Sequence, residues 1–304
     1  MIHPVAEWDN LNSRWNAFQT CVKSEMAFPD DGLPSMCLAL FAREFGLSVP
    51  KVVLIAWLYG MCYNPLTVMY IYSEIEKGIN ITTEWWSQNK SILEFEPDKA
   101  KIKNMNKFIP AFESYLQNKE GLKNCILTED FEHLVVFCKR LKFVGFHAIY
   151  LMCDVLQAYF GNSLPCLPQK IDWKTRKLPT EGALMLVGAD EMLPYEENKP
   201  IPQEYLDLMN KVIEYTISNT GADIAEIESV LCAFRKLYKQ TRYTGYYRDR
   251  HLEDINKSLM PKWITERSLK YRKELLPIEL LGEYSGWSGI RKEKCKEFMK
   301  HGKL

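Results

Sequence analysis

Residues 223–250 read DIAEIESVLCAFRKLYKQTRYTGYYRDR, and the first half of this stretch carries the clearest helical pattern in the chain. Asp223 is a residue type that caps helix N-termini, and Glu226 follows it at the spacing of a capping box. Apolar side chains then recur at helical spacing, as expected for a helix with one buried face; they are Ile224, Ile227, Leu231, Phe234 and Tyr238. The pattern therefore predicts a helix over 223–240.

Helical periodicity also dominates the rest of the chain and predicts a mainly α protein, a compact helical bundle. Asn64-Pro65 is a clear helix start, with an N-cap residue before a proline. The apolar run Val52–Tyr63 is too short to span a bilayer and predicts a buried helix. The best strand-like run is Ala183–Val187, between Gly182 and Gly188. We expect helices over 5–27, 33–46, 49–62, 65–77, 82–93, 98–118, 129–141, 146–160, 202–219, 223–240 and 249–259.

Prolines divide the helical pattern into two blocks. Residues 161–201 contain five prolines and little periodicity, so we expect an irregular connection there. It would join an N-terminal helical block, 1–160, to a C-terminal helical block, 202–304, that holds the stretch 223–250. Connections of this length are often functional.

Composition excludes several classes of protein. The 39 basic and 39 acidic residues give a net charge of zero, which argues against a generally adhesive DNA binder but permits a local basic groove. Nine cysteines without a CxxC pair fit a reducing compartment, so we expect a cytoplasmic protein. The N-terminus lacks the blocks of a signal peptide, and we expect no membrane partner. Because P-loop, GxGxxG and HExxH motifs are absent, we expect no cofactor and no metal.

The second half of 223–250 is strongly basic. It sets six cations against one acid, Asp249; the cations are Arg235, Lys236, Lys239, Arg242, Arg248 and Arg250. Tyrosines lie between them, at Tyr238, Tyr243, Tyr246 and Tyr247. Cations interleaved with aromatic rings suit a ligand with phosphates and flat rings, so nucleic acid is the first candidate. The alternative is a solvated face with ordinary ion pairs.

Residues 129–160 predict a helix, a tight turn and a second helix. The turn Leu141-Lys-Phe-Val-Gly145 resembles the helix-hairpin-helix of DNA repair glycosylases, in which backbone N–H groups bind a DNA phosphate. The match is degenerate, because Lys142-Phe143 stand where Pro-Gly is usual. An ordinary helical hairpin is the alternative. The candidate DNA-binding residues are Lys142, Val144, Gly145, Lys239 and Tyr246.

Glu228-Ser-Val-Leu-Cys-Ala-Phe-Arg-Lys236, Arg242-Tyr-Thr-Gly245 and Tyr247-Arg-Asp-Arg250 together resemble the signature of the phage amino acid:DNA transferases. These enzymes are related to the α-glutamyl/putrescinyl thymine pyrophosphorylases. The resemblance would cover about 1–260, with Trp57-Leu-Tyr59 and Asn64-Pro65-x-Thr67 compatible but less specific.

The resemblance implies a reaction on phage double-stranded DNA, in the host cytoplasm. Thymine is replaced there by 5-hydroxymethyluracil, whose hydroxymethyl group is then phosphorylated. The transferase displaces the phosphate or pyrophosphate with an amino acid or another amine, which completes a thymine hypermodification.

The residues of the basic stretch fit this chemistry. Departure of (pyro)phosphate needs cations on the leaving oxygens, and the incoming amine must lose a proton to a carboxylate. Glu228 is the first candidate for the base and Asp249 the second, although Glu228 could instead orient Arg235, the candidate leaving-group cation. A base flipped out of the duplex would stack on aromatic rings. The candidate substrate-binding residues are Lys236, Arg242, Tyr243, Arg248, Arg250, Trp57 and Asn64. Trp57 belongs to an N-terminal aromatic cluster that could equally well form part of the hydrophobic core.

Two other functions remain open at this point. A helix-hairpin-helix DNA glycosylase or lyase would share the DNA partner and base flipping, but residues 163–167, where its catalytic Asp is expected, read Ser-Leu-Pro-Cys-Leu. A non-catalytic DNA-binding or virion-assembly protein would need the basic stretch but no buried Glu228.

Overall fold

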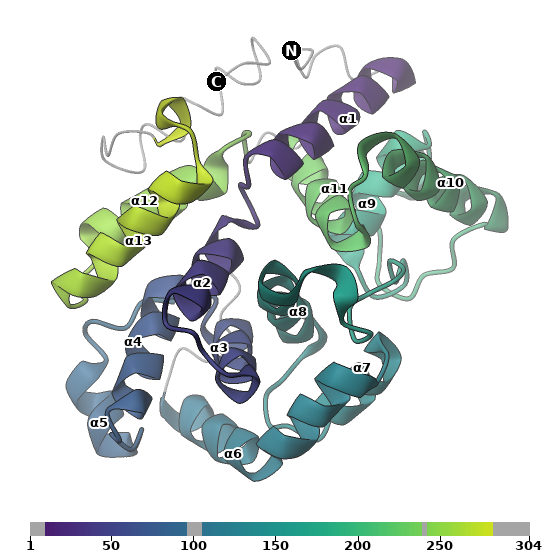
Figure 1. The fold of residues 1–304 in the computed structure, drawn as a ribbon. Helices are drawn as coiled ribbons and strands as arrows, with labels where there is room; N and C mark the ends of the chain where they lie inside the picture. Colours follow the sequence, from purple (N-terminus) through teal and green to yellow (C-terminus); the bar gives the residue numbers. More distant parts are fainter. Residues whose placement is uncertain (1–9, 96–104, 239–241, 282–304) are drawn as a thin grey trace. The chain divides into compact units, whose positions relative to one another are not determined.

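The computed structural model describes residues 10–95, 105–238 and 242–281, and the regular structure of these residues is helical without a strand. This confirms the predicted mainly α fold. The chain divides into two compact units. The described part of unit 1 lies within Met1–Asp31 and Gln169–Glu253, and that of unit 2 within Gly32–Pro168 and Asp254–Gly282 (Figure 1).

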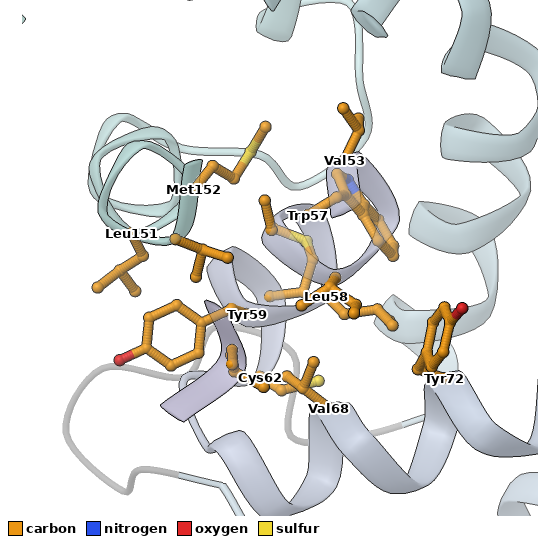
Figure 2. Close-up of a cluster of buried hydrophobic side chains, with 14 of the residues drawn as sticks. Val53, Trp57, Leu58, Tyr59, Cys62, Val68, Tyr72, Leu151 and Met152 are labelled. Carbon is orange, nitrogen blue, oxygen red and sulfur yellow. The ribbon is translucent and has the colours of Figure 1, made fainter. Parts of the chain in front are cut away.

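Unit 2 is built around α3 (Val49–Cys62), which packs against α4 (Pro65–Glu76), α6 (Met105–Thr128) and α8 (Phe146–Phe160). The apolar run predicted as a buried helix is this α3, and its side chains meet those of α8 in the core (Figure 2). Gly60 allows the close approach, because a Cβ there would lie 2.6 Å from the carbonyl oxygen of Ala148. The remaining helices of the unit are α2 (Leu33–Glu44), α5 (Thr83–Asn89), α7 (Phe131–Cys138) and α13 (Lys262–Leu275).

The predicted helical hairpin is present in unit 2 as α7, a turn and α8. Asp130 caps α7 by accepting a hydrogen bond from the backbone N–H of His133 at 2.9 Å. In the turn, Phe143 has a φ of 63°, the left-handed conformation that glycine adopts most easily. The turn therefore has a tight, left-handed backbone without the usual Pro-Gly.

Unit 1 contains α1 (Leu11–Ala27), α9 (Lys177–Leu186), α10 (Gln203–Thr220), α11 (Ile224–Tyr238) and the start of α12 (Tyr246–Lys257). α11 packs against α9, α1 and α10. The predicted capping box starts α11: the N–H of Glu226 donates to Asp223 Oδ1 and the N–H of Asp223 donates to Glu226 Oε2, both at 2.9 Å. The local sequence signal at this helix start is thus confirmed.

The strand-like run Ala183–Val187 was wrongly interpreted, because Ala183–Leu186 lie in α9. Every residue from Pro179 to Leu186 is buried, so α9 has no polar face in this part. A short run that is apolar on all sides carries no periodicity, and a buried helix then reads like a buried strand. The segment expected to be irregular, 161–201, therefore holds a core helix of unit 1.

Within the described residues, no helix combines the length and the apolar character that a bilayer crossing requires. The eight cysteines in this part of the chain are free thiols.

Candidate functional site

The basic stretch borders a pocket of unit 1 with about 530 Å³ of empty space, its open mouth included. The walls come from α1, the loop after it, α11, the turn at 242–245 and the first turn of α12. Four of the predicted site residues line this pocket, namely Arg242, Tyr243, Tyr246 and Arg248. Three carboxylates that the sequence analysis did not identify line it as well, those of Glu25, Asp30 and Asp31.

Asp30 joins the loop after α1 to the start of α12. Its Oδ2 accepts from the N–H of Gly245 at 3.0 Å, and its Oδ1 accepts from the N–H of Arg248 at 2.8 Å. The N–H of Arg248 is a donor that an N-cap side chain would satisfy, and Gly245, with a φ of 89°, has no side chain to do so. The N–H of Gly245 is the donor that the third helical residue satisfies in a capping box. This cap from a distant segment marks the start of α12 at Tyr246, three residues before the start expected from the sequence, so Arg248 lies on the helix.

Burial dominates the electrostatics of Asp30. It raises the pKa of this carboxyl from 3.8 to about 6, while the guanidinium and the N–H of Arg248 act in the opposite direction and the charge of Asp31 adds to the rise. The Arg248 guanidinium is 4.0 Å away, and it also donates to the carbonyl oxygen of Phe28 at 3.1 Å. The pocket therefore contains an acid that titrates well above the range of exposed aspartates.

We expect this titration to be visible in the stability of the protein. Because the folded pKa of Asp30 exceeds its unfolded value, the free energy of unfolding should fall as pH rises from about 4 to about 6, on the order of 2–3 kcal/mol. Asp30→Asn should lack this fall, and Asp31→Asn should keep it. Carbon NMR of the aspartate carboxyls, with urea unfolding across this pH range, tests the expectation. A carboxyl of Asp30 that titrates near pH 4 would contradict it.

Cations and tyrosines form one wall of the pocket. The guanidinium carbon of Arg242 lies 3.8 Å from the ring centre of Tyr246, a cation–π distance. The Nε of Arg242 is shielded from solvent and has no acceptor among the residues that the structure describes. Nearby, the hydroxyl of Tyr243 donates to Asp249 Oδ2 at 2.6 Å, and Lys236 Nζ lies 3.2 Å from the hydroxyl of Tyr247.

Glu228 and Arg235 lie on α11 in two separate buried ion pairs with the α9 region. Nε and Nη2 of Arg176 both donate to Glu228 Oε1, Nε at 2.8 Å. Arg235 Nε donates to Glu181 Oε2 at 2.7 Å, and Glu181, which is 0% exposed, also accepts from the N–H of Tyr195. Glu228 is therefore positioned by Arg176, and the counter-charge of Arg235 is Glu181. This arrangement favours a positioning role for both residues within unit 1.

The other predicted site residues are placed as follows. Trp57 is 0% exposed and lies in the hydrophobic core of unit 2 (Figure 2). A core role was the alternative to substrate binding for this aromatic cluster. Asn64 caps α4, since its Oδ1 accepts from the N–H of Thr67 at 3.0 Å. Lys142 is exposed, and it lies with Val144 and Gly145 in the α7–α8 turn of unit 2. Arg250 is half-buried on α12. Lys239 lies outside the described residues.

Several residues of the site have no local sequence signal. Arg176 and Glu181 lie in the segment expected to be irregular, and Asp30 lies in a short loop between two helices. Their partners are 52 or more residues away in sequence. Only the acidic pair Asp30-Asp31 next to Gly32, in a chain segment that must turn, could have drawn attention.

No three His, Cys, Asp or Glu side chains gather in a metal-binding arrangement in the part of the chain that the structure describes.

Comparison with known proteins adds one relative. No protein family profile matches the chain, and no solved structure matches it. The chain is similar to the serinyltransferase of Salmonella phage ViI, with 22% identity in a match that covers 84% of this chain and 71% of the relative. The similarity therefore extends over most of both chains.

Proposed function

We propose that the protein transfers an amino acid, or another amine, to phosphoryl-activated 5-hydroxymethyluracil in phage double-stranded DNA. The observation that carries this proposal is the similarity to a phage serinyltransferase over 84% of the chain. The signature around Arg242-Tyr-Thr-Gly245 supports it, because this signature borders a pocket with cations, carboxylates and tyrosines. Serine is the first donor to test.

The reaction is a displacement at the methylene carbon attached to C5 of the uracil ring. The nitrogen lone pair of the donor forms a C–N bond to this carbon while the C–O bond to the leaving group breaks. Phosphate or pyrophosphate departs with the bonding electron pair, and a carboxylate accepts the proton that the amine loses. Cations preorganised around the leaving oxygens would contribute most to the rate.

We propose a division of labour for these steps. Lys236 and Arg250, which are not part of the pocket lining, are the candidates for contact with the DNA phosphates or the leaving group, and the pocket cations Arg242 and Arg248 are candidates for binding the other substrate. In this proposal Asp249 or a pocket carboxylate acts as the base rather than Glu228, because the Glu228 carboxylate is buried against Arg176. In this proposal Glu228 and Arg235 hold α11 against the α9 region, and the α7–α8 turn provides a second DNA contact.

Incubation of the protein with duplex DNA that contains phosphorylated 5-hydroxymethyluracil and with a mixture of amino acids should yield a new nucleoside. Mass spectrometry of the digested DNA should find a mass increase that corresponds to one amino acid minus water, relative to 5-hydroxymethyl-2′-deoxyuridine. Duplexes with thymine or unphosphorylated 5-hydroxymethyluracil are the controls, because they lack a leaving group and should remain unchanged.

Two other outcomes would overturn the proposal. Abasic sites in the same DNA would assign the protein to the glycosylases. DNA binding that weakens with rising salt, without any new nucleoside under these conditions, would leave only a DNA-binding protein.

A further inference from the structure

The pocket of unit 1 carries both signs of charge. Its lining includes three acidic residues, Glu25, Asp30 and Asp31, and two arginines, Arg242 and Arg248. A phosphate group would therefore meet more anions than cations in this pocket, and like charges at such distances repel. A small molecule with separate positive and negative groups is complementary to the same lining.

Arg242 is the cation of the pocket with unused capacity. Its Nε–H is shielded from water and has no acceptor among the described residues, although a buried donor of this kind is costly to leave unsatisfied. Its guanidinium carbon lies over the ring of Tyr246, 3.8 Å from the ring centre. A ligand carboxylate matches the planar fork of a guanidinium, so a carboxylate is the group that Arg242 would bind best.

The two Asp30 oxygens already accept backbone N–H groups, from Gly245 and Arg248. Glu25 Oε1 accepts from the N–H of Asp30 at 2.9 Å, so it is fixed beside the pocket. Asp31 follows directly in the chain and is half-buried in the same lining. The lining therefore places Asp31 and Glu25 beside Asp30, and a ligand cation in the pocket would lie close to these carboxylates.

The α11 side of the pocket is mostly apolar. Val230, Ala233 and Leu237 line it, with the hydroxyl of Ser229 beside them. A small side chain would contact this surface while the charged groups of the ligand reach the opposite walls. The pocket thus offers three kinds of surface to one small molecule.

We propose that this pocket binds the donor as a zwitterionic α-amino acid, with its carboxylate on Arg242 and its ammonium on Asp31 and Glu25. The inference rests on the proposed function for the identity of the donor. The donor would then lie next to the signature residues Arg242-Tyr-Thr-Gly245. The DNA would bring the activated base to this bound donor.

Three probes separate the two charged contacts: L-serine, ethanolamine, which lacks the carboxylate, and 3-hydroxypropanoate, which lacks the ammonium. Calorimetry, with the full chain alone and with duplex DNA present, should show that serine binds more tightly than either partial probe. Arg242→Ala should lower the affinity for serine and for 3-hydroxypropanoate by at least about tenfold, the usual effect of one charged hydrogen bond. The affinity for ethanolamine should not change. Asp31→Asn should weaken serine and ethanolamine without changing 3-hydroxypropanoate.

Control variants keep the test independent of folding. Arg242→Lys retains the charge but not the planar fork, so its affinity for serine and for 3-hydroxypropanoate should lie between the affinities of the wild type and of Arg242→Ala. Lys211→Ala and Glu214→Gln remove exposed charges from α10, outside the pocket, and should bind all three probes as the wild type does. Circular dichroism identifies any variant that fails to fold, and Arg242→Lys then replaces Arg242→Ala in the comparison.

The possible failures are distinguishable. Serine that binds no better than the partial probes, or equally well to all variants, would overturn the pocket assignment even if amino acid transfer to DNA is observed. A variant Arg242→Ala that loses DNA affinity but keeps serine affinity would assign the pocket to a DNA phosphate. In a third outcome, Arg242→Ala weakens binding only of the probes with a carboxylate, and Asp31→Asn only of those with an ammonium, in a protein that modifies no DNA. This result would support amino acid binding in the pocket and overturn the proposed function.

Discussion

Arg235→Ala should lower the free energy of unfolding of unit 1 by roughly 3–5 kcal/mol, because it removes the counter-charge of a buried carboxylate. Glu181 is 0% exposed, and its Oε2 accepts from Arg235 Nε at 2.7 Å. Breaking one side of such a pair is costly, whereas replacing both sides together costs much less. The double variant Arg235→Met with Glu181→Gln should therefore regain much of the loss.

Urea unfolding and hydrogen exchange of the α9 and α11 amides would measure this effect. Lys236→Ala is the matched control, since Lys236 is the next cation on the same helix and is half-buried, with its Nζ 3.2 Å from the hydroxyl of Tyr247. This variant should change the unfolding free energy by about 1 kcal/mol or less. An Arg235→Ala protein with wild-type stability but turnover slower by about 10²–10³-fold would instead place Arg235 on the leaving group.

The second large effect is expected for Gly182→Ala, at the contact between α9 and α11. A Cβ at this position would lie 2.3 Å from the carbonyl oxygen of Leu231 and 3.0 Å from its carbonyl carbon. Both are backbone atoms, so the two helices would have to separate. Overpacking of this kind typically costs about 1–3 kcal/mol or more, which exceeds the roughly 1 kcal/mol that alanine gains over glycine inside a helix.

Gly121→Ala provides the comparison, because it also places alanine inside a helix. Its Cβ would lie 2.9 Å from Cζ of Phe137, the far end of a half-buried ring that can turn away. We expect Gly121→Ala to be close to neutral and Gly182→Ala to expose the amides of α9 and α11 to exchange. Equal stability of the two variants in urea would show that α9 and α11 do not approach each other at Gly182.

The two variants also bear on the candidate pocket. α11 forms one of its walls through Val230, Ala233 and Leu237, and α9 holds α11 from the other side. A shift of α11 in Gly182→Ala should therefore weaken serine binding together with stability. Gly121 lies in unit 2, so Gly121→Ala should leave serine binding unchanged.

Much of the helical framework could be read from the sequence, because its signals are local. The capping box of Asp223 and Glu226, the start at Asn64-Pro65 and the buried run of α3 involve residues within a few positions of one another. A pattern of this range fixes backbone hydrogen bonds and helical faces without knowledge of the rest of the chain. The basic, tyrosine-rich stretch was also evident from the sequence, and four of its predicted residues line one pocket.

Tertiary structure alone decided the partners of these residues. The cap of α12 comes from Asp30, 215 residues before Gly245 and 218 before Arg248 in the chain. Arg235 pairs with Glu181 across 54 residues, and Glu228 with Arg176 across 52, rather than with each other on one helical face. α9 itself was hidden, because a helix buried on all sides has no polar face to reveal its period. Periodicity reports which side of a helix is buried, but not which distant side chain meets it, because that choice depends on how the helices pack in three dimensions.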